Sequence, residues 1–240
     1  VYHFILNLGL IQSGWFEFGY SFNAPTWSIS AELVVYLIFF IILFKLPKER
    51  RLIMYILMVF IGLTIQKINL NYPLINLSMS RVFVGFFIGC LTYEACNTLK
   101  SSKMRGLILT LSGLGLLIVI ASGIIFGHKA FGNWTTVYTL IIYPLIIVLS
   151  INITVLNSIL SFRPLVYLGS ISYSIYLWHF PLQLIIKTMD DTLLLGIDFT
   201  TRKMFLGFLF LTLIISIVSY ELIEKPAQNY LRNRFLKQKS

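Results

Sequence analysis

The sequence predicts an all-α protein that crosses a membrane several times as a polytopic bundle of helices. Apolar residues make up 58% of the 240-residue chain and charged residues only 12%, whereas a soluble domain carries about a quarter charged residues. Mean hydropathy is +0.85, and the apolar residues form runs long enough to cross roughly 30 Å of hydrocarbon as helix. Lys and Arg sit in short clusters between these runs, which is typical of membrane-flanking loops.

The apolar runs, bounded by charges, Gly, Asn or Pro, predict seven spans in chain order. They cover residues 25–44, 52–67, 80–97, 106–126, 136–155, 168–187 and 204–223, and the second is short. Residues 1–24 are expected to be an interfacial or partial helix and a loop, and residues 25–223 the transmembrane bundle. Pro226 is expected to end the last span, so that residues 224–240 form a basic cytoplasmic interfacial tail on anionic lipid.

Lys and Arg also predict the orientation, because basic loops stay on the cytoplasmic side of a membrane. If the turn after the first span is cytoplasmic, thirteen cations fall on that side and six, including Lys67 and Arg81, on the other. This bias predicts an odd number of crossings and a cytoplasmic C-terminus. The net charge of +10 is therefore assigned to the lipid surface, and no nucleic acid is expected as a partner, since the sequence offers no basic groove or recognition helix.

Few ionisable residues lie inside the apolar runs, where each costs roughly 2.5–3.5 kcal/mol and needs a partner, water or a function. Glu32 lies one helical turn after Ser28, so the two side chains share a face of the first span. Trp27 is expected to anchor that face at the membrane interface. Glu32 either serves a site or merely pairs with an Arg or a hydroxyl of a neighbouring helix, and both interpretations stay open.

A second polar group follows one face of the predicted span 168–187. Ser172, Tyr176, His179 and Gln183 stand at offsets of four, seven and eleven residues and predict a stripe that faces the bundle interior or a cavity. Ser and Tyr hydroxyls of such a stripe can hold an imidazole by hydrogen bonds. His179 is therefore either a functional residue or a core histidine whose hydrogen bonds are simply satisfied.

The remaining polar positions lie near the ends of spans. Arg81 is expected either to snorkel to the interface or to clamp an anionic donor or an oxyanion with its guanidinium. Glu224, on one face with Ser216 and Tyr220, is expected to pair with a nearby Lys or Arg, and Glu94 to be solvated or interfacial. No metal-ligand spacing and no Gly-rich phosphate loop is found.

Three segments, in this order, resemble the acyltransferase family 3 membrane proteins, which O-acylate surface glycans. The first is similar to the family's Trp-Ser-x-Ser-x-Glu motif and contains Trp27, Ser28, Ser30 and Glu32. The second is similar to Gly-x-x-Ser-Tyr-x-x-Tyr-Leu-x-His and contains Gly169, Ser172, Tyr173, Tyr176, Leu177 and His179. The third is similar to the closing Ile-Glu-Lys-Pro motif at residues 223–226, and Arg81 with Phe83 and Gly89 resembles the family's Arg-initiated helix.

The resemblance implies a membrane-bound transferase in the inner or plasma membrane of a bacterium. It implies transfer of an acyl group, acetyl in the first instance, from a CoA-type donor to a sugar hydroxyl of a glycan or lipid-linked glycan. Acyl-CoA would be a co-substrate, and neither a bound cofactor nor a metal is implied. The catalytic residues would be Glu32, His179 and Arg81, and the substrate-binding residues Trp27, Ser28, Ser172, Tyr173 and Tyr176.

The resemblance also implies an earlier portion whose first helix carries an Arg and a His assigned the catalytic work. The sequence begins at what resembles the linker before the Trp-Ser segment, so we expect the C-terminal part of such an enzyme, with doubtful activity on its own. Under this hypothesis Glu32 orients that His, Arg81 binds the donor or the oxyanion, and the stripe lines the acceptor cavity. The alternatives are a transporter or flippase of a lipid-linked glycan, a seven-helix receptor, and a noncatalytic remnant or partner subunit.

Overall fold

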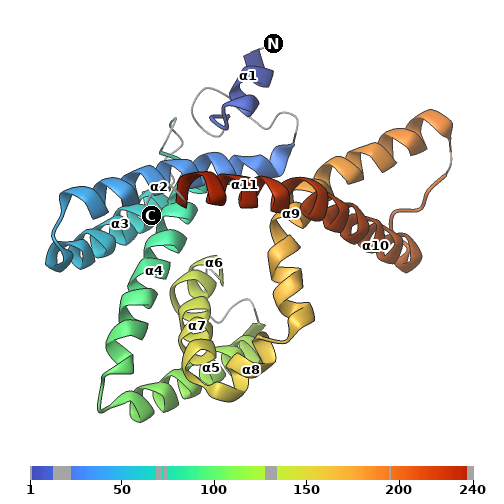
Figure 1. The fold of residues 1–240 in the computed structure, drawn as a ribbon. Helices are drawn as coiled ribbons and strands as arrows, with labels where there is room; N and C mark the ends of the chain where they lie inside the picture. The colour runs from blue at the N-terminus through green and yellow to red at the C-terminus, as the bar shows by residue number, and fades with distance from the viewer. Residues whose placement is uncertain are drawn as a thin grey trace. The chain divides into compact units, whose positions relative to one another are not determined.

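The computed structural model describes residues 2–12, 23–68, 72, 75–127, 134–194 and 196–236, which form helices and no strand (Figure 1). The first half of the chain contains α1 (Tyr2–Leu8), the 3₁₀ turn η1 (Ala24–Thr26), α2 (Trp27–Lys45), α3 (Lys48–Ile68), α4 (Leu77–Lys100) and α5 (Arg105–Phe126). The second half contains α6 (Trp134–Val137), the π turn η3 (Tyr138–Ile142), α7 (Tyr143–Asn152), α8 (Thr154–Leu160), α9 (Arg163–Leu193), α10 (Arg202–Ser219), the π turn η4 (Tyr220–Glu224) and α11 (Lys225–Leu236). The prediction of an all-α fold is confirmed.

Within the described ranges, six helical stretches are long and apolar enough to cross a membrane. They are Ala24–Lys45, Lys48–Ile68, Leu77–Lys100, Arg105–Phe126, Trp134–Asn152 and Arg202–Phe235. The other predicted span, residues 168–187, lies inside α9, which has 31 residues. This helix is long enough but more polar than the six, because Ser, Tyr, Trp and His recur along it. Residues 13–22 of the predicted N-terminal segment and residues 237–240 of the predicted tail lie outside the described residues.

The second span is longer than predicted, because the charged residues before it fold as its first turn. α3 begins at Lys48 rather than at residue 52. The Arg51 guanidinium reaches back from this turn, and its Nε and Nη2 atoms donate to the carbonyls of Leu46 and Leu43 at 3.0 and 2.9 Å. Carbonyls at a helix C-terminus have no partner within their own helix. Arg51 thus caps α2 and fixes the tight turn into α3.

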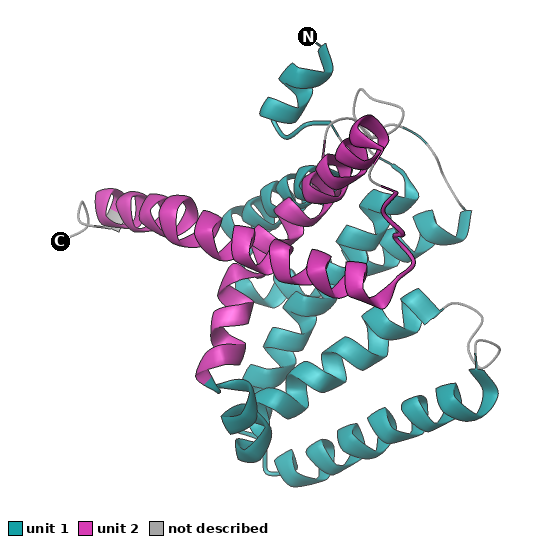
Figure 2. Cartoon of the chain, turned by 90° about the vertical axis from the view of Figure 1, so that its right-hand side faces the viewer, with its two compact units in different colours: residues 1–21, 27–162 teal, residues 22–26, 163–240 magenta. Residues whose placement is uncertain are grey.

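The chain divides into two compact units (Figure 2). Unit 1 comprises residues 1–21 and 27–162, and unit 2 comprises residues 22–26 and 163–240. The boundary after residue 26 falls between η1 and α2, which are consecutive in the chain.

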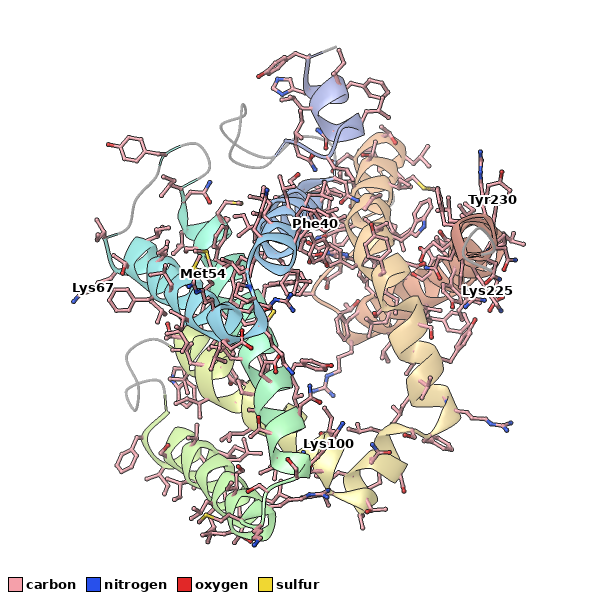
Figure 3. All side chains as sticks on the ribbon, turned by 60° about the vertical axis from the view of Figure 1, so that its left-hand side comes forward. Phe40, Met54, Lys67, Lys100, Lys225 and Tyr230 are labelled. Atoms are coloured by element: carbon pink, nitrogen blue, oxygen red, sulfur yellow. The ribbon has the colours of Figure 1, made fainter. Side chains whose placement is uncertain are left out.

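The core of unit 1 is built on an antiparallel pair of helices, α3 and α4. Val35 and Ile42 of α2 pack into this core with Tyr55 and Val59 of α3 and Val84 and Phe87 of α4. Gly62 lets the pair approach closely, since a Cβ there would lie 2.6 Å from Val84 Cγ2 and 3.1 Å from the Ser80 carbonyl oxygen. Lys67 at the end of α3 and Lys100 at the end of α4 consequently mark opposite ends of the pair (Figure 3).

Unit 2 consists of η1, α9, α10, η4 and α11. α9 packs along α10, and α10 continues through η4 into α11. The helix does not break at Pro226, because it runs on to Leu236 through the π turn η4, and the segment expected as an interfacial tail is helical as far as this residue. Proline lacks an N–H group and its ring clashes with the carbonyl four residues earlier. In the wider turn, the Lys225 N–H bonds to the Tyr220 carbonyl five residues back. A second π turn, η3, likewise stands directly before Tyr143 and Pro144 in unit 1.

Candidate functional site

The site in unit 2 is organised around Pro181, which lies inside α9. Because proline has no N–H group, the carbonyl of Leu177 four residues earlier loses its intrahelical donor. The side-chain amide of Asn23 supplies the missing bond, with Nδ2 donating to the Leu177 oxygen at 2.9 Å. A residue 154 positions away in sequence thus repairs the backbone of α9.

A second hydrogen bond joins the same two segments. The hydroxyl of Tyr176 donates to the carbonyl of Pro25. The short turn itself is closed by the backbone N–H and the hydroxyl of Thr26, which both donate to the Asn23 carbonyl, at 3.0 and 2.6 Å. Residues 23–26 are therefore held against two consecutive residues of α9, Tyr176 and Leu177.

His179 lies one turn after these contacts and is oriented by the backbone of its own helix. Its Nδ1 atom is 2.6 Å from the carbonyl oxygen of Tyr176. A carbonyl oxygen can only accept, so Nδ1 is assigned the hydrogen, and the neutral tautomer with this hydrogen has its lone pair at Nε2. No described residue bonds to Nε2. The ring of Tyr176 lies beside the imidazole, with 5.7 Å between ring centroids.

The predicted polar stripe is only partly correct. Tyr176 and His179 are half-buried, but Ser172 and Gln183 are exposed, and the Ser172 hydroxyl donates to the Gly169 carbonyl at 2.8 Å. The imidazole is therefore held by a backbone carbonyl and not by the Ser and Tyr hydroxyls that the stripe predicts. The buried face of α9 is the adjacent one, with Ile171, Ser174 and Leu182. Tyr173 is 49% exposed.

The fully buried Ser174 connects α9 to the end of the last span. Its hydroxyl donates to Oε1 of Glu224. The expectation that Glu224 pairs with Lys or Arg is therefore wrong, because the Lys225 ammonium bonds to Oε2 of Glu221 instead, at 2.6 Å. The hydroxyl of Tyr167 donates to the other oxygen of Glu221 at 3.3 Å. Both glutamates of the π turn therefore bond to α9, Glu224 through Ser174 and Glu221 through Tyr167.

The other predicted site residues belong to unit 1. Trp27 and Ser28 form the first turn of α2 and are half-buried. Glu32 is exposed one turn later and accepts a hydrogen bond from the Tyr36 hydroxyl at 3.2 Å. Its partner is thus a residue of its own helix and not of a neighbouring one. Arg81 is exposed near the start of α4, and no described residue forms a hydrogen bond or an ion pair with its guanidinium.

Glu94, which was expected near the end of a span as a solvated or interfacial residue, lies inside α4 and is half-buried. It lines a cavity within unit 1. As for metal binding, the part of the chain that the structure describes contains no group of three or more His, Cys, Asp or Glu side chains able to hold a metal ion.

Comparison with known proteins identifies the family. A family model described as an acyltransferase domain matches residues 1–221. The chain belongs to acyltransferase family 3. No curated protein and no solved structure matches it. Together with the six apolar helical stretches, this membership makes the chain a membrane protein of an acyltransferase family.

Within unit 2, α9 bonds both to the turn at residues 23–26 and to the segment at residues 223–226. Asn23 precedes the first segment and bonds to Leu177 in the second, and Ser174 in the second bonds to Glu224 in the third. Sequence reasoning missed Asn23, Pro181 and Ser174 as parts of the site. A proline inside an expected helix was the available signal, because it leaves a carbonyl that requires a donor from elsewhere.

Proposed function

We propose that this acyltransferase family 3 protein moves an acyl group, acetyl in the first instance, from an acyl-CoA donor to a sugar hydroxyl of a cell-surface glycan. The observation that carries the proposal is the imidazole of His179, which is fixed through Nδ1. A lone pair at Nε2 is suited to accept the hydrogen bond of an alcohol and to orient its oxygen for attack.

The reaction needs few groups. The sugar oxygen, held by its hydrogen bond to Nε2 of His179, attacks the thioester carbonyl of the donor. The new bond is C–O and the bond that breaks is C–S. The hydroxyl proton ends on the sulfur of CoA, which leaves as the thiol. Correct placement of the two reactants accounts for much of the rate in such transfers, because it replaces a bimolecular encounter.

The acceptor site in this proposal is the exposed side of α9 next to His179. Ser172 and Tyr173 are exposed there and offer hydroxyl groups to a sugar. Tyr176 has a positioning role, since its hydroxyl is committed to Pro25 and its ring lies beside the imidazole. Trp27 and Ser28, at the start of α2, belong to unit 1 and are assigned to substrate binding separately, through an aromatic face and a hydroxyl.

Arg81 and Glu32 are assigned separately, because they belong to unit 1. Arg81 has guanidinium donors without a described partner, and such donors stabilise an oxyanion that develops on an attacked carbonyl. The positive-inside count puts Arg81 with Lys67 on the non-cytoplasmic side, away from CoA phosphates held at the cytoplasmic side. Only the acyl end of the donor would have to reach Arg81, which favours the oxyanion over the donor phosphates. Glu32 supplies a carboxylate that orients a protonated or hydroxyl group of the substrate complex.

The proposal is tested in membranes of cells that produce the chain. Membranes receive acetyl-CoA labelled in the acetyl group, and label is measured in the glycan fraction. Replacing His179 with Ala is expected to lower incorporation roughly a hundredfold, at unchanged membrane level of the protein. His179→Gln is expected to retain more, because the Gln carbonyl also accepts a hydrogen bond.

His3→Ala is the matched control, since it removes the same side chain from α1. Full incorporation by His179→Ala would contradict the proposal. Translocation of a lipid-linked glycan without any acylation would instead favour the transporter alternative.

A further inference from the structure

Unit 1 contains a cavity of about 790 Å³ that the proposed reaction does not use. Side chains of α3, α4, α5 and α7 surround it. Most of its wall is apolar and includes Leu52, Leu91 and Ile108. Its polar part contains two cations and two carboxylates, namely Lys48, Arg51, Glu49 and Glu94.

The carboxylate of Glu94 points to an absent partner. Glu94 is half-buried within a membrane-spanning helix, and no described residue forms a hydrogen bond or an ion pair with its carboxylate. A charge at such a position requires a counter-ion or water, because the hydrocarbon offers neither. A cationic group inside the cavity would supply the missing counter-ion of the Glu94 carboxylate.

On the α3 side of the cavity lie two cations, Lys48 and Arg51, with hydrogen-bond donors that no described residue uses. Lys48 is exposed in the first turn of α3 and has no described partner. Arg51 caps α2 with Nε and Nη2, and its Nη1 atom makes no hydrogen bond to a described residue. Ammonium and guanidinium groups both bind phosphate oxygens. The cavity therefore offers a place for an anion and, against Glu94, a place for a cation.

The position of the cavity indicates that the ligand comes from the bilayer. The cavity lies at the end of the α3–α4 pair that carries Lys48 and Lys100, and Lys67 marks the other end (Figure 3). By the positive-inside count this is the cytoplasmic end, so the charged wall lies at the level of the lipid headgroups. The apolar walls continue from there toward the hydrocarbon.

We propose that this cavity binds a phospholipid with a zwitterionic headgroup that bears a primary ammonium, as in phosphatidylethanolamine. Lys48 and Arg51 hold the phosphate, Glu94 accepts hydrogen bonds from the ammonium, and the acyl chains lie along the apolar walls. The balanced charges match a zwitterion, whereas a polyanionic CoA would leave Glu49 and Glu94 next to its phosphates. The site is thus separate from the donor site and does not depend on the proposed reaction.

The test compares three phospholipids with identical acyl chains. The purified full chain in detergent is equilibrated with equal amounts of phosphatidylethanolamine, phosphatidylcholine and phosphatidylglycerol, and bound lipid is counted by native mass spectrometry. We expect phosphatidylethanolamine to be retained roughly tenfold over the other two, the worth of one charge-assisted hydrogen bond. Glu94→Gln is expected to reduce it to the level of phosphatidylcholine, whose headgroup has no N–H.

Two further variants separate the two ends of the headgroup. Lys48→Gln is expected to weaken all three phospholipids equally, because they share the phosphate. Asp191→Asn, which neutralises an exposed carboxylate on α9, is expected to change nothing. Equal retention of the three lipids by the unmodified chain would overturn the proposal without any variant. So would a preference for phosphatidylglycerol, displacement of the lipid by free CoA, or an unchanged preference in a folded Glu94→Gln protein.

Discussion

The pairing of α3 with α4 in unit 1 and the attachments of α9 in unit 2 are two different ways of joining helices in lipid. The first pair meets through apolar side chains and a close approach at Gly62. α9 is tied to its neighbours by the hydrogen bonds of Asn23, Tyr176 and Ser174. Between apolar helices in a membrane, shape decides the contact. In unit 2 the contacts are instead hydrogen bonds, and each pairs a polar group of α9 with a partner from another segment.

The largest effect is expected where shape decides. Gly62→Ala would place a methyl group 2.6 Å from Val84 Cγ2 and 3.1 Å from the Ser80 carbonyl, which belongs to the backbone and cannot step aside. We expect a loss of about 2 kcal/mol in the free energy of unfolding, measured by denaturation in detergent. Gly113→Ala is the control, since nothing lies within 4 Å of its new methyl group. Equal losses for both variants would contradict the close approach.

The next effect concerns the repaired carbonyl of Leu177. Asn23→Ala removes its donor and is expected to cost roughly 1–2 kcal/mol of unfolding free energy, the penalty of a buried unsatisfied group. In a Pro181→Ala background the new N–H of residue 181 bonds to the same carbonyl, so Asn23→Ala should cost little there. A double-mutant cycle measured by thermal unfolding in detergent reports this coupling. Strictly additive effects would show that Asn23 and Pro181 act independently.

A smaller effect is expected for the contact between α9 and the last span. Ser174→Ala keeps the packing volume but removes the donor to Glu224, at a cost of about 1 kcal/mol. Ser170→Ala is the matched control, because Ser170 is exposed and bonds only to the Val166 carbonyl of its own helix. The two variants are compared by unfolding temperature. An equal change in both would show that the bond from Ser174 to Glu224 does not contribute to stability.

The smallest effect depends on pH and lies in the loop between α9 and α10. The hydroxyl and the backbone N–H of Thr200 donate to Oδ1 of Asp198 at 2.6 and 2.9 Å, and they lower the pKa of Asp198 below its ordinary value of 3.8. A lowered folded-state pKa adds stability above the unfolded-state pKa, and this stability is lost as pH falls through the folded value. The difference in unfolding temperature between the natural chain and Asp198→Ala should therefore stay constant down to about pH 5 and shrink below pH 4. A difference that persists at pH 2 would contradict this assignment.

The sequence predicted the apolar spans well, because lipid makes run length a direct measure of helix length. It placed the start of α3 too late, since Lys48 to Arg51 looked like a loop although Arg51 is needed to cap α2. It did not foresee that the helix continues past Pro226, since a rule about proline in an α-helix does not cover a π turn that accommodates the ring. The first of these differences arises where one residue, Arg51, satisfies the backbone of another helix.

For the candidate site, the sequence found the right segments but not their connections. His179 and Tyr176 were recognised by helical spacing, which is local information. The partners of Leu177 and Glu224 come from residues 154 and 50 positions away, and spacing along one helix says nothing about them. The prediction that Glu224 pairs with a cation failed for the same reason. The ammonium of Lys225 bonds to Glu221, one helical turn earlier, and not to the adjacent Glu224.

The π turn at Tyr220–Glu224 also sets the phase of the helix that follows. An α-helix turns by about 100° per residue, so deleting one residue from this turn would swing the face of α11 around its axis by that amount. The same deletion would bring the ring of Pro226 against a carbonyl four residues earlier. Pro226 therefore disfavours loss of the extra residue from the π turn. This single residue sets the direction, relative to α10, in which the Lys and Arg side chains of α11 point.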